Sequence, residues 1–184
     1  MSASRISAIV YLWALAACVG AAQAPAPAPG PEYKVLESLV GVWHFDGRVN
    51  AIPELGMTDS GPVTYTHVNQ MAHGGFFLET RRTGTGPRGP VTELFVYSYT
   101  PATKTYRQDT YDNRGRMRTF TATVVDRTWQ FTGTNTSATG QTTTERYTMV
   151  YAADMMSAAL RSEHSKDNVT WFERMTGTYV RMSR

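Results

Sequence analysis

Residues 93–115 read ELFVYSYTPATKTYRQDTYDNRG, and this stretch decides the fold class. Its two runs of aromatic and β-branched residues, at 93–100 and 106–112, are typical of β-strands. Pro101 suits the second position of a type I turn between these runs. The segment 112–115 supplies Asp, Asn and Gly, which tolerate the positive φ of a hairpin connection. The stretch therefore predicts successive antiparallel strands.

The same pattern continues in both directions along the chain, and ten strands joined by short links are expected. They lie at 43–50, 63–71, 76–82, 93–100, 106–112, 117–125, 128–132, 142–152, 158–165 and 170–181. Residues 83–90 hold three glycines and two prolines and are expected to form a loop. Closure into a barrel removes the unpaired edges of a sheet. The predicted fold is all-β, an antiparallel meander closing into a barrel of about 8–10 strands, with a β-sandwich as the alternative.

Helical spacing is confined to the start of this region. Val35, Leu36, Leu39 and Val40 are placed as on one face of a helix. This spacing predicts a short helix over 33–40 that ends at Gly41.

The first thirty residues are expected to direct export. Residues 6–17 are apolar and uncharged, and at twelve residues they are shorter than the roughly 20 needed to span a bilayer. Such a run suits a signal peptide over 1–17. The following Leu15-Ala16-Ala17-Cys18 resembles a bacterial lipobox, which makes Cys18 the expected lipid attachment site. The alternatives are cleavage after Ala24 with secretion, or a Cys18 that is merely part of the apolar run.

Residues 18–31 contain alternating alanine and proline. This composition favours extended polyproline II, so the segment is expected to be a tether ahead of a barrel domain at 32–184. The predicted location is the bacterial cell envelope, lipid-anchored at the outer membrane or periplasmic. Secretion is the alternative.

The composition excludes several classes of protein. Hydrophobic residues are 41%, aromatic residues 11% and charged residues 18%, which argues against a disordered chain. The net charge of +3 is not gathered in a Lys/Arg run, so no nucleic acid partner is expected. The single cysteine, Cys18, excludes an internal disulfide and a cysteine-based zinc site.

Catalytic and metal motifs are also missing from the sequence. There is no G-x-S-x-G, no H-E-x-x-H and no G-K-[ST]. The four histidines, His44, His67, His73 and His164, lack metal-ligand spacing. We therefore expect no catalytic residue, no metal and no cofactor, and lean against an enzyme.

Charged pairs two residues apart occur inside the predicted strands. Because side chains alternate along a strand, each pair shares one face. One interpretation is an outer face with cross-strand ion pairs, and the other is a polar and aromatic pocket whose arginines bind a ligand carboxylate. Alternation does not say which face points inward. The candidate pocket residues are Glu79, Arg81, Tyr97, Arg107, Asp109, Tyr147, Arg161, Glu163 and Trp171.

Gly41-Val42-Trp43 follows the predicted helix and opens the first strand. Glycine–any–tryptophan at this place resembles the entry motif of calycins, the superfamily of lipocalins and fatty-acid-binding proteins. The resemblance implies that Trp43 closes one barrel end and packs against Arg181 in the last strand.

More of the chain resembles one calycin-like bacterial family, the domain of unknown function 1579. The similar segments lie at 36–43, 73–79, 99–106, 112–115, 129–131 and 167–181. Asn168 stands where the family more often has glycine, and asparagine tolerates the same left-handed conformation. The resemblance implies a calycin-like barrel without a known activity. Haem-binding relatives of this architecture use an axial histidine, which makes haem the alternative to the absence of a cofactor.

Three functions follow from these observations. The first is an exported, membrane-tethered barrel that binds a small apolar or amphipathic ligand. The second is a structural or interaction protein of the envelope, with a barrel filled by its own side chains. The third is a small enzyme that uses inward carboxylates.

Overall fold

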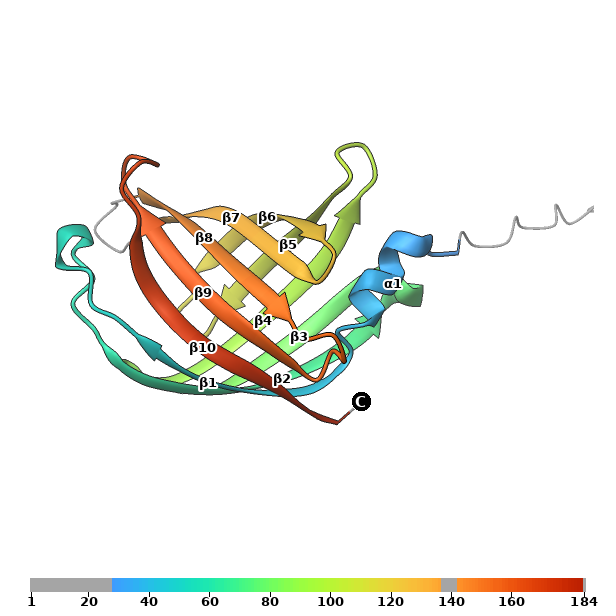
Figure 1. The fold of residues 1–184 in the computed structure, drawn as a ribbon, viewed down its shortest axis with the longest axis horizontal. Helices are drawn as coiled ribbons and strands as arrows, with labels where there is room; N and C mark the ends of the chain where they lie inside the picture. The colour runs from blue at the N-terminus through green and yellow to red at the C-terminus, as the bar shows by residue number, and fades with distance from the viewer. Residues whose placement is uncertain (1–27, 137–141, 184) are drawn as a thin grey trace, which may run out of the picture.

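The computed structural model describes residues 28–136 and 142–183. It is a closed barrel of ten antiparallel strands, in which consecutive strands pair and the last strand pairs with the first (Figure 1). The predicted meander and its closure are confirmed, and the sandwich alternative is wrong. The strands are β1 (Gly41–Val49), β2 (Gly61–Ala72), β3 (Phe77–Gly86), β4 (Gly89–Thr100), β5 (Thr105–Asp112), β6 (Met117–Val125), β7 (Thr128–Thr136), β8 (Thr142–Tyr151), β9 (Ser157–Ser165) and β10 (Phe172–Ser183).

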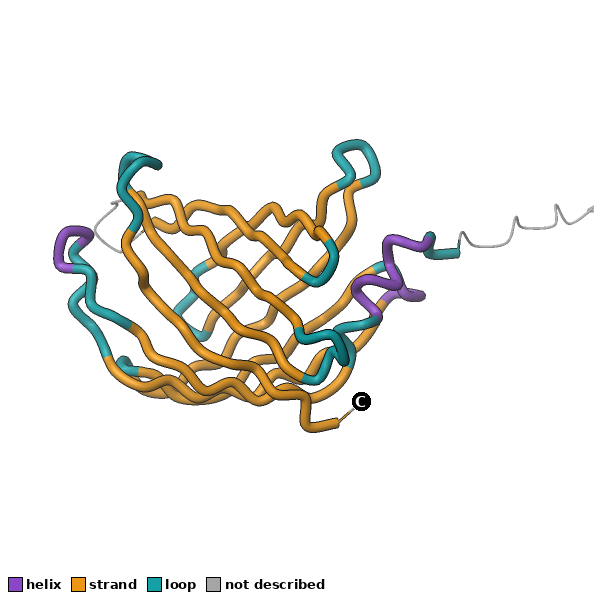
Figure 2. The backbone as a smooth tube through the Cα atoms, viewed as in Figure 1, coloured by secondary structure: helices purple, strands orange, loops and turns teal. Residues whose placement is uncertain are grey.

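In the described part of the chain, three short helices accompany the strands (Figure 2). They are α1 (Pro31–Glu37) and the 3-10 turns η1 (Pro53–Leu55) and η2 (His73–Gly75). The helix begins two residues earlier than expected, since Pro31 is preorganised for a first helical turn. Gly41 opens β1, with φ of 131°, instead of ending the helix. Within the described ranges, no helix is long and apolar enough to cross a membrane.

The loop expected over 83–90 is wrong, because β3 and β4 continue through this region to a tight turn at Pro87 and Arg88. Gly84 pairs with Tyr65 of β2, and a Cβ at this position would lie only 2.8 Å from the Tyr65 Cα. Glycine therefore serves a close approach between two strands here, where composition alone indicated a loop.

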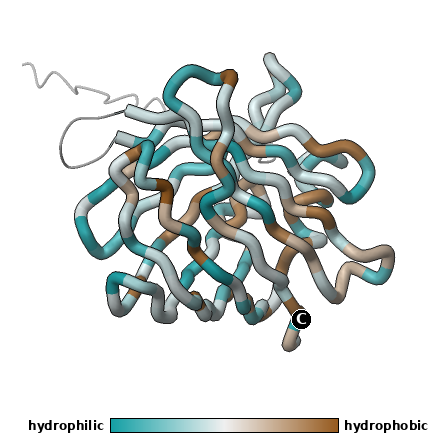
Figure 3. The backbone as a smooth tube through the Cα atoms, turned by 60° about the vertical axis from the view of Figure 1, so that its left-hand side comes forward, coloured by the Kyte–Doolittle hydropathy of each residue, from teal (hydrophilic) through white to brown (hydrophobic). Residues whose placement is uncertain are grey.

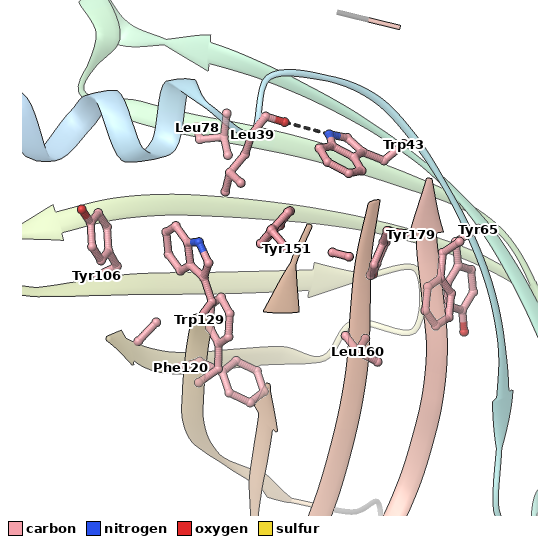
Figure 4. Packing of buried hydrophobic residues seen from close by; sticks show 14 of the residues in the cluster. Leu39, Trp43, Tyr65, Leu78, Tyr106, Phe120, Trp129, Tyr151, Leu160 and Tyr179 are labelled. Carbon is pink, nitrogen blue, oxygen red and sulfur yellow. Dashed lines mark hydrogen bonds between the residues drawn. The ribbon is translucent and has the colours of Figure 1, made fainter. Parts of the chain in front are cut away.

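The core fills much of the barrel interior. Buried and more exposed positions alternate along strands such as β2 and β5, as a sheet with one buried face requires. Figure 3 shows hydrophobic residues scattered among hydrophilic ones along the strands. Phe45, Leu78 and Phe131 are among the fully buried side chains. Aromatic rings dominate the cluster of buried hydrophobic residues, and Figure 4 shows several of them gathered inside the barrel.

One end of the barrel is closed by α1 and by the turn that follows it (Figure 1). Trp43 is buried, and its indole Nε1 donates a hydrogen bond of 2.9 Å to the Leu39 carbonyl (Figure 4). The Arg181 guanidinium carbon lies 4.4 Å from the centre of the Trp43 ring, and Arg181 Nη2 donates a hydrogen bond to the Ser38 carbonyl. These residues form the contact that the resemblance implied.

The seam between β1 and β10 contains two facing glycines, Gly47 and Gly177. The Phe45 ring lies over both, so that a Cβ at Gly47 would come within 2.5 Å of the Phe45 Cζ. The two strands can therefore curve under an aromatic ring that rests on their backbone, which is a recognised way to bend a barrel sheet.

Candidate functional site

A cavity of about 90 Å³ lies inside the barrel. Its aromatic walls come from strands around the whole circumference. They are formed by Trp43, Phe95, Tyr97, Phe120, Tyr147 and Tyr179. The interior of the barrel is thus not completely filled by side chains.

A wider vestibule of about 830 Å³ lies next to this cavity. Its walls include the connections between β1 and β2, between β3 and β4, and between β5 and β6. These connections lie at the end opposite α1 (Figure 1). Arg82, Arg118, Glu145, Ser162 and Met175 line both spaces. They form a layer between the cavity and the vestibule.

Ion pairs occupy this layer. Arg82 and Glu93 face each other across β3 and β4 and form a buried salt bridge. Arg118 lies 3.1 Å from Glu93 and 3.5 Å from Glu145. Two arginines thus meet two glutamates, and the charge of the layer balances. We call these four residues the ion layer.

Glu145 also contacts two polar side chains of β9. Its carboxylate accepts a hydrogen bond of 3.4 Å from the Ser162 hydroxyl and lies 3.7 Å from His164 Nε2. Burial lowers the pKa of His164 despite the opposing effect of Glu145. A buried, neutral histidine and a serine therefore complete the wall beside the ion layer.

A hydrogen-bond chain crosses the cavity wall through Gln108. The Gln108 Nε2 donates to the Tyr97 hydroxyl at 2.6 Å, and the Tyr147 hydroxyl donates to Gln108 Oε1 at 2.5 Å. Burial raises the pKa of Tyr97 to about 12 and that of Tyr147 well above its ordinary value. Both tyrosines are therefore neutral hydrogen-bonding groups at physiological pH.

His67 is a second buried histidine of the interior. Burial and, to a smaller extent, the charge of Arg82 lower its pKa well below the ordinary value. Its ring packs against the rings of Phe95 and Tyr179. The ring centres are 5.9 Å apart for Phe95 and 5.0 Å apart for Tyr179. The packing keeps the imidazole neutral, which suits an aromatic interior.

These two histidines should make the fold less stable in acid. The folded protein holds them neutral, whereas the unfolded chain protonates them below about pH 6.5. Their contribution is present above that pH and is lost as the pH falls, by at most about 1.4 kcal/mol per pH unit and histidine. We expect His67→Gln to reduce the loss of stability between pH 6 and pH 5 in urea unfolding. His44→Gln, on the outer face, is the control and retains both buried histidines. If His67→Gln left the loss of unfolding free energy between pH 6 and pH 5 unchanged, His67 would not be a cause of the acid sensitivity.

The vestibule carries an excess of positive charge. Beyond the ion layer, its walls hold Arg88, Arg114, Arg116 and Arg174 against Asp59 and Asp112, a net charge of +2. Asp59 lies 2.6 Å from Arg174 Nη2 and 3.5 Å from Arg88 Nε. Asp112 lies 2.6 Å from Arg116 Nη2. The positive excess favours an anionic group at the mouth.

Two of the nine predicted pocket residues, Tyr97 and Tyr147, line the cavity. The three charged pairs instead lie on the outer face, which corrects the interpretation of them as pocket residues. Arg81 lies 3.7 Å from Glu79, Arg107 Nε 2.8 Å from Asp109 Oδ2, and Arg161 Nη2 3.0 Å from Glu163 Oε1. Trp171 also lies outside the cavity, with the Arg146 guanidinium 3.9 Å from its ring centre.

The pairs lie outside because the alternate residues of the same strands are the buried ones. On β3, Leu78 and Thr80 are buried and alternate with Glu79 and Arg81. Hydrogen bonds from Arg107 and Thr119 hold the pKa of Asp109 below its ordinary value, although its partial burial acts in the opposite direction. The outer pairs are therefore surface contacts between neighbouring side chains of a single strand.

Sequence reasoning missed Arg82 and Arg118 as residues of the interior. Their signal is positional, since Arg82 has the same parity along β3 as Leu78 and Thr80. Among the described residues, no group of three or more histidine, aspartate or glutamate side chains could hold a metal ion. Cys18 lies outside the described residues.

A model of one protein family matches residues 28–181. The chain belongs to this family. It is described as "Protein of unknown function (DUF1579)", the family predicted from the sequence. No curated protein matches the chain.

The DUF1579 barrel is similar to the crystal structure of Rv2717c from M. tuberculosis. The TM-score is 0.56 at 12% sequence identity, and the match covers 83% of this chain and 98% of that chain. At this identity the similarity concerns the fold alone. The chemistry of the cavity, the ion layer and the vestibule of this DUF1579 protein follows from the residues that form them.

Proposed function

We propose that the protein is an exported, membrane-tethered barrel that binds a small amphipathic ligand. The observation that carries this proposal is a partly empty aromatic cavity that adjoins a vestibule with excess positive charge. An apolar part of the ligand would occupy the cavity, and an acidic group would lie among the vestibule arginines. Concave, mostly apolar sites with few polar groups are the usual form of small-molecule sites.

Native mass spectrometry tests whether a ligand is bound. Protein purified from its own cells without denaturation should carry a small-molecule adduct, which organic extraction should release. A barrel free of any adduct that also fails to bind 3-phenylpropionate, a small aromatic acid, would overturn the proposal. Repeated capture of one envelope protein by such a barrel would instead support the interaction function.

Tethering would act through Cys18, which the sequence places ahead of an alanine- and proline-rich segment. Since α1 lies at the end opposite the vestibule (Figure 1), a tether joined to α1 would approach the barrel from its closed end. The vestibule would then point away from the membrane. Mass spectrometry of the membrane fraction should find an acylated Cys18 as the mature N-terminus, and a mature chain without that residue would exclude the anchor.

Charge reversal in the vestibule should weaken the binding of an acidic ligand. Arg114 is an exposed vestibule residue, and Arg114→Glu should raise the Kd for 3-phenylpropionate by about 3- to 10-fold at low salt. The Kd for the uncharged 3-phenylpropanol should change less. Arg81→Glu makes the same charge change on the outer face and is the matched control in calorimetric titrations. An equal effect of both variants on the Kd would show that the vestibule does not bind the acidic group.

A further inference from the structure

Three polar atoms without a partner line the cavity in one cross-strand row. Asn69 of β2 pairs with Thr80 of β3, Thr80 pairs with Phe95 of β4, and Phe95 pairs with Thr110 of β5. The Asn69 Oδ1, Thr80 Oγ1 and Thr110 Oγ1 atoms are buried and have no hydrogen-bond partner. All three residues line the cavity. We call them the polar row.

Leaving such buried polar atoms without a hydrogen-bond partner lowers the stability of the fold. The two threonines are each 1% exposed, and a buried polar group without a partner costs about 1–3 kcal/mol. Most buried polar groups in proteins find partners, and an exception calls for an explanation such as a bound molecule. The other amide atom of Asn69, Nδ2, is already used, since it donates to the Leu39 carbonyl at 2.9 Å. The free Oδ1 atom therefore needs a donor from within the cavity.

The cavity offers no uncompensated charge to a ligand. Arg82 and Arg118 are both paired with glutamates of the ion layer. Burial raises the pKa of Tyr179 as it does those of Tyr97 and Tyr147, so the phenols are neutral. A charged group that entered this space would lose its hydration without gaining a counter-ion. The part of a ligand that enters the cavity must therefore be neutral.

Size and shape narrow the ligand further. A cavity needs about 10–15 Å³ to hold one water molecule, so a cavity of about 90 Å³ holds roughly six to nine non-hydrogen atoms. A long acyl chain does not fit. Phe95 and Tyr179 line the cavity, and aromatic side chains pack well in stacked or edge-on arrangements with another ring.

We propose that the cavity binds a neutral, single-ring molecule or ring substituent that carries a hydrogen-bond donor, with the polar row as its partner. This inference rests on the proposed function and names the part of the ligand that the interior recognises. A phenol has the required size, neutrality and donor. Its hydroxyl can donate to Asn69 Oδ1 and exchange hydrogen bonds with a threonine hydroxyl, while its ring packs against the aromatic wall.

Calorimetric titration of the full-length protein with phenol, toluene and benzoate tests this inference. Phenol should bind at least about 3- to 10-fold more tightly than toluene, because one net hydrogen bond is worth about 0.5–1.5 kcal/mol. Benzoate, which is charged and similar in size, should also bind more weakly than phenol. Toluene or benzoate binding as tightly as phenol would overturn the inference.

Thr80→Val and Thr110→Val provide the variants, since valine keeps the shape and removes the hydroxyl. At least one of them should raise the Kd for phenol by about 3- to 10-fold and leave the Kd for toluene nearly unchanged. Their melting temperatures without ligand should stay level or rise, by about 2–4 °C where the lost hydroxyl was unpaired. Weaker phenol binding would then not be a folding defect. Thr83→Val, on the outer face of the same strand, is the matched control.

Unchanged phenol affinity in both inward variants would overturn the role of the polar row. The outcomes also separate the two proposals. A native adduct or 3-phenylpropionate binding without phenol binding would leave the proposed function standing and refute the neutral-ring inference. If the protein carried no native adduct and bound neither 3-phenylpropionate nor phenol, both the proposed function and the neutral-ring inference would be refuted.

Discussion

Replacing Gly177 with valine should destabilise the barrel by about 3 kcal/mol or more, at the upper end of overpacking effects. A Cβ at this position would lie 2.6 Å from Phe45 Cε2 and would also meet the Asp46 backbone oxygen. Neither neighbour can move easily, because the Phe45 ring is fully buried and Asp46 belongs to the paired strand β1. Urea unfolding followed by circular dichroism should show the loss as a lower midpoint, or the variant should fail to fold.

Thr178→Val is the matched control for this prediction. Thr178 is the next residue of β10 and is exposed on the outer face. Its replacement by a residue that favours strands should change the stability by less than about 0.5 kcal/mol. A Gly177→Val variant as stable as this control would mean that the seam does not need glycine under Phe45.

Replacing Glu93 with leucine should cost about 3–5 kcal/mol, the range observed when one partner of a buried ion pair is removed. Arg118 would keep Glu145 as a partner, but Arg82, whose side chain is only 12% exposed, would lose its carboxylate. The aromatic rings of Tyr65 and Phe95, with centres 4.5 and 4.8 Å from the Arg82 Cζ, would compensate for only part of this loss. Chemical denaturation at neutral pH measures the effect.

The double variant Glu93→Leu with Arg82→Met should recover most of the lost stability. Apolar residues of similar size often replace a buried ion pair with little cost. Asp109→Asn, which breaks an outer ion pair with Arg107, should cost less than about 1 kcal/mol. If the double variant were no more stable than Glu93→Leu alone, an unpaired arginine would not be the cause of the loss.

The sequence predicted the ten strands because their boundaries are chemically marked. Pro101 and the 112–115 segment occupy the turns where they were expected. The end of β3 and the start of β4, near Gly84, could not be predicted in the same way. Glycine there allows two strands to approach, and this requirement depends on a neighbour nearly twenty residues away in the sequence.

The candidate site was predicted less well than the fold. The interior of this barrel is polar as well as aromatic, so charge and hydrophobicity do not separate its two faces. Arg82 lies inside and Arg81 outside, although they are adjacent and chemically identical. The distinction follows from the alternation of side chains along β3, and the sequence does not say which of the two alternating sets points inward. Tyr97 and Tyr147 line the cavity, whereas Trp171 lies outside it, so an aromatic side chain alone does not identify the inner face.

The pairing of β1 with β10 has a consequence for folding kinetics. In the other nine described ladders, strands that follow one another in the sequence pair, so each hairpin can form independently. The last ladder joins segments separated by most of the chain. Its loop-closure entropy must be paid before its contacts form, which makes such long-range pairing intrinsically slow. The facing glycines and the Trp43–Arg181 contact both lie on this ladder, so they stabilise the pairing that closes the barrel.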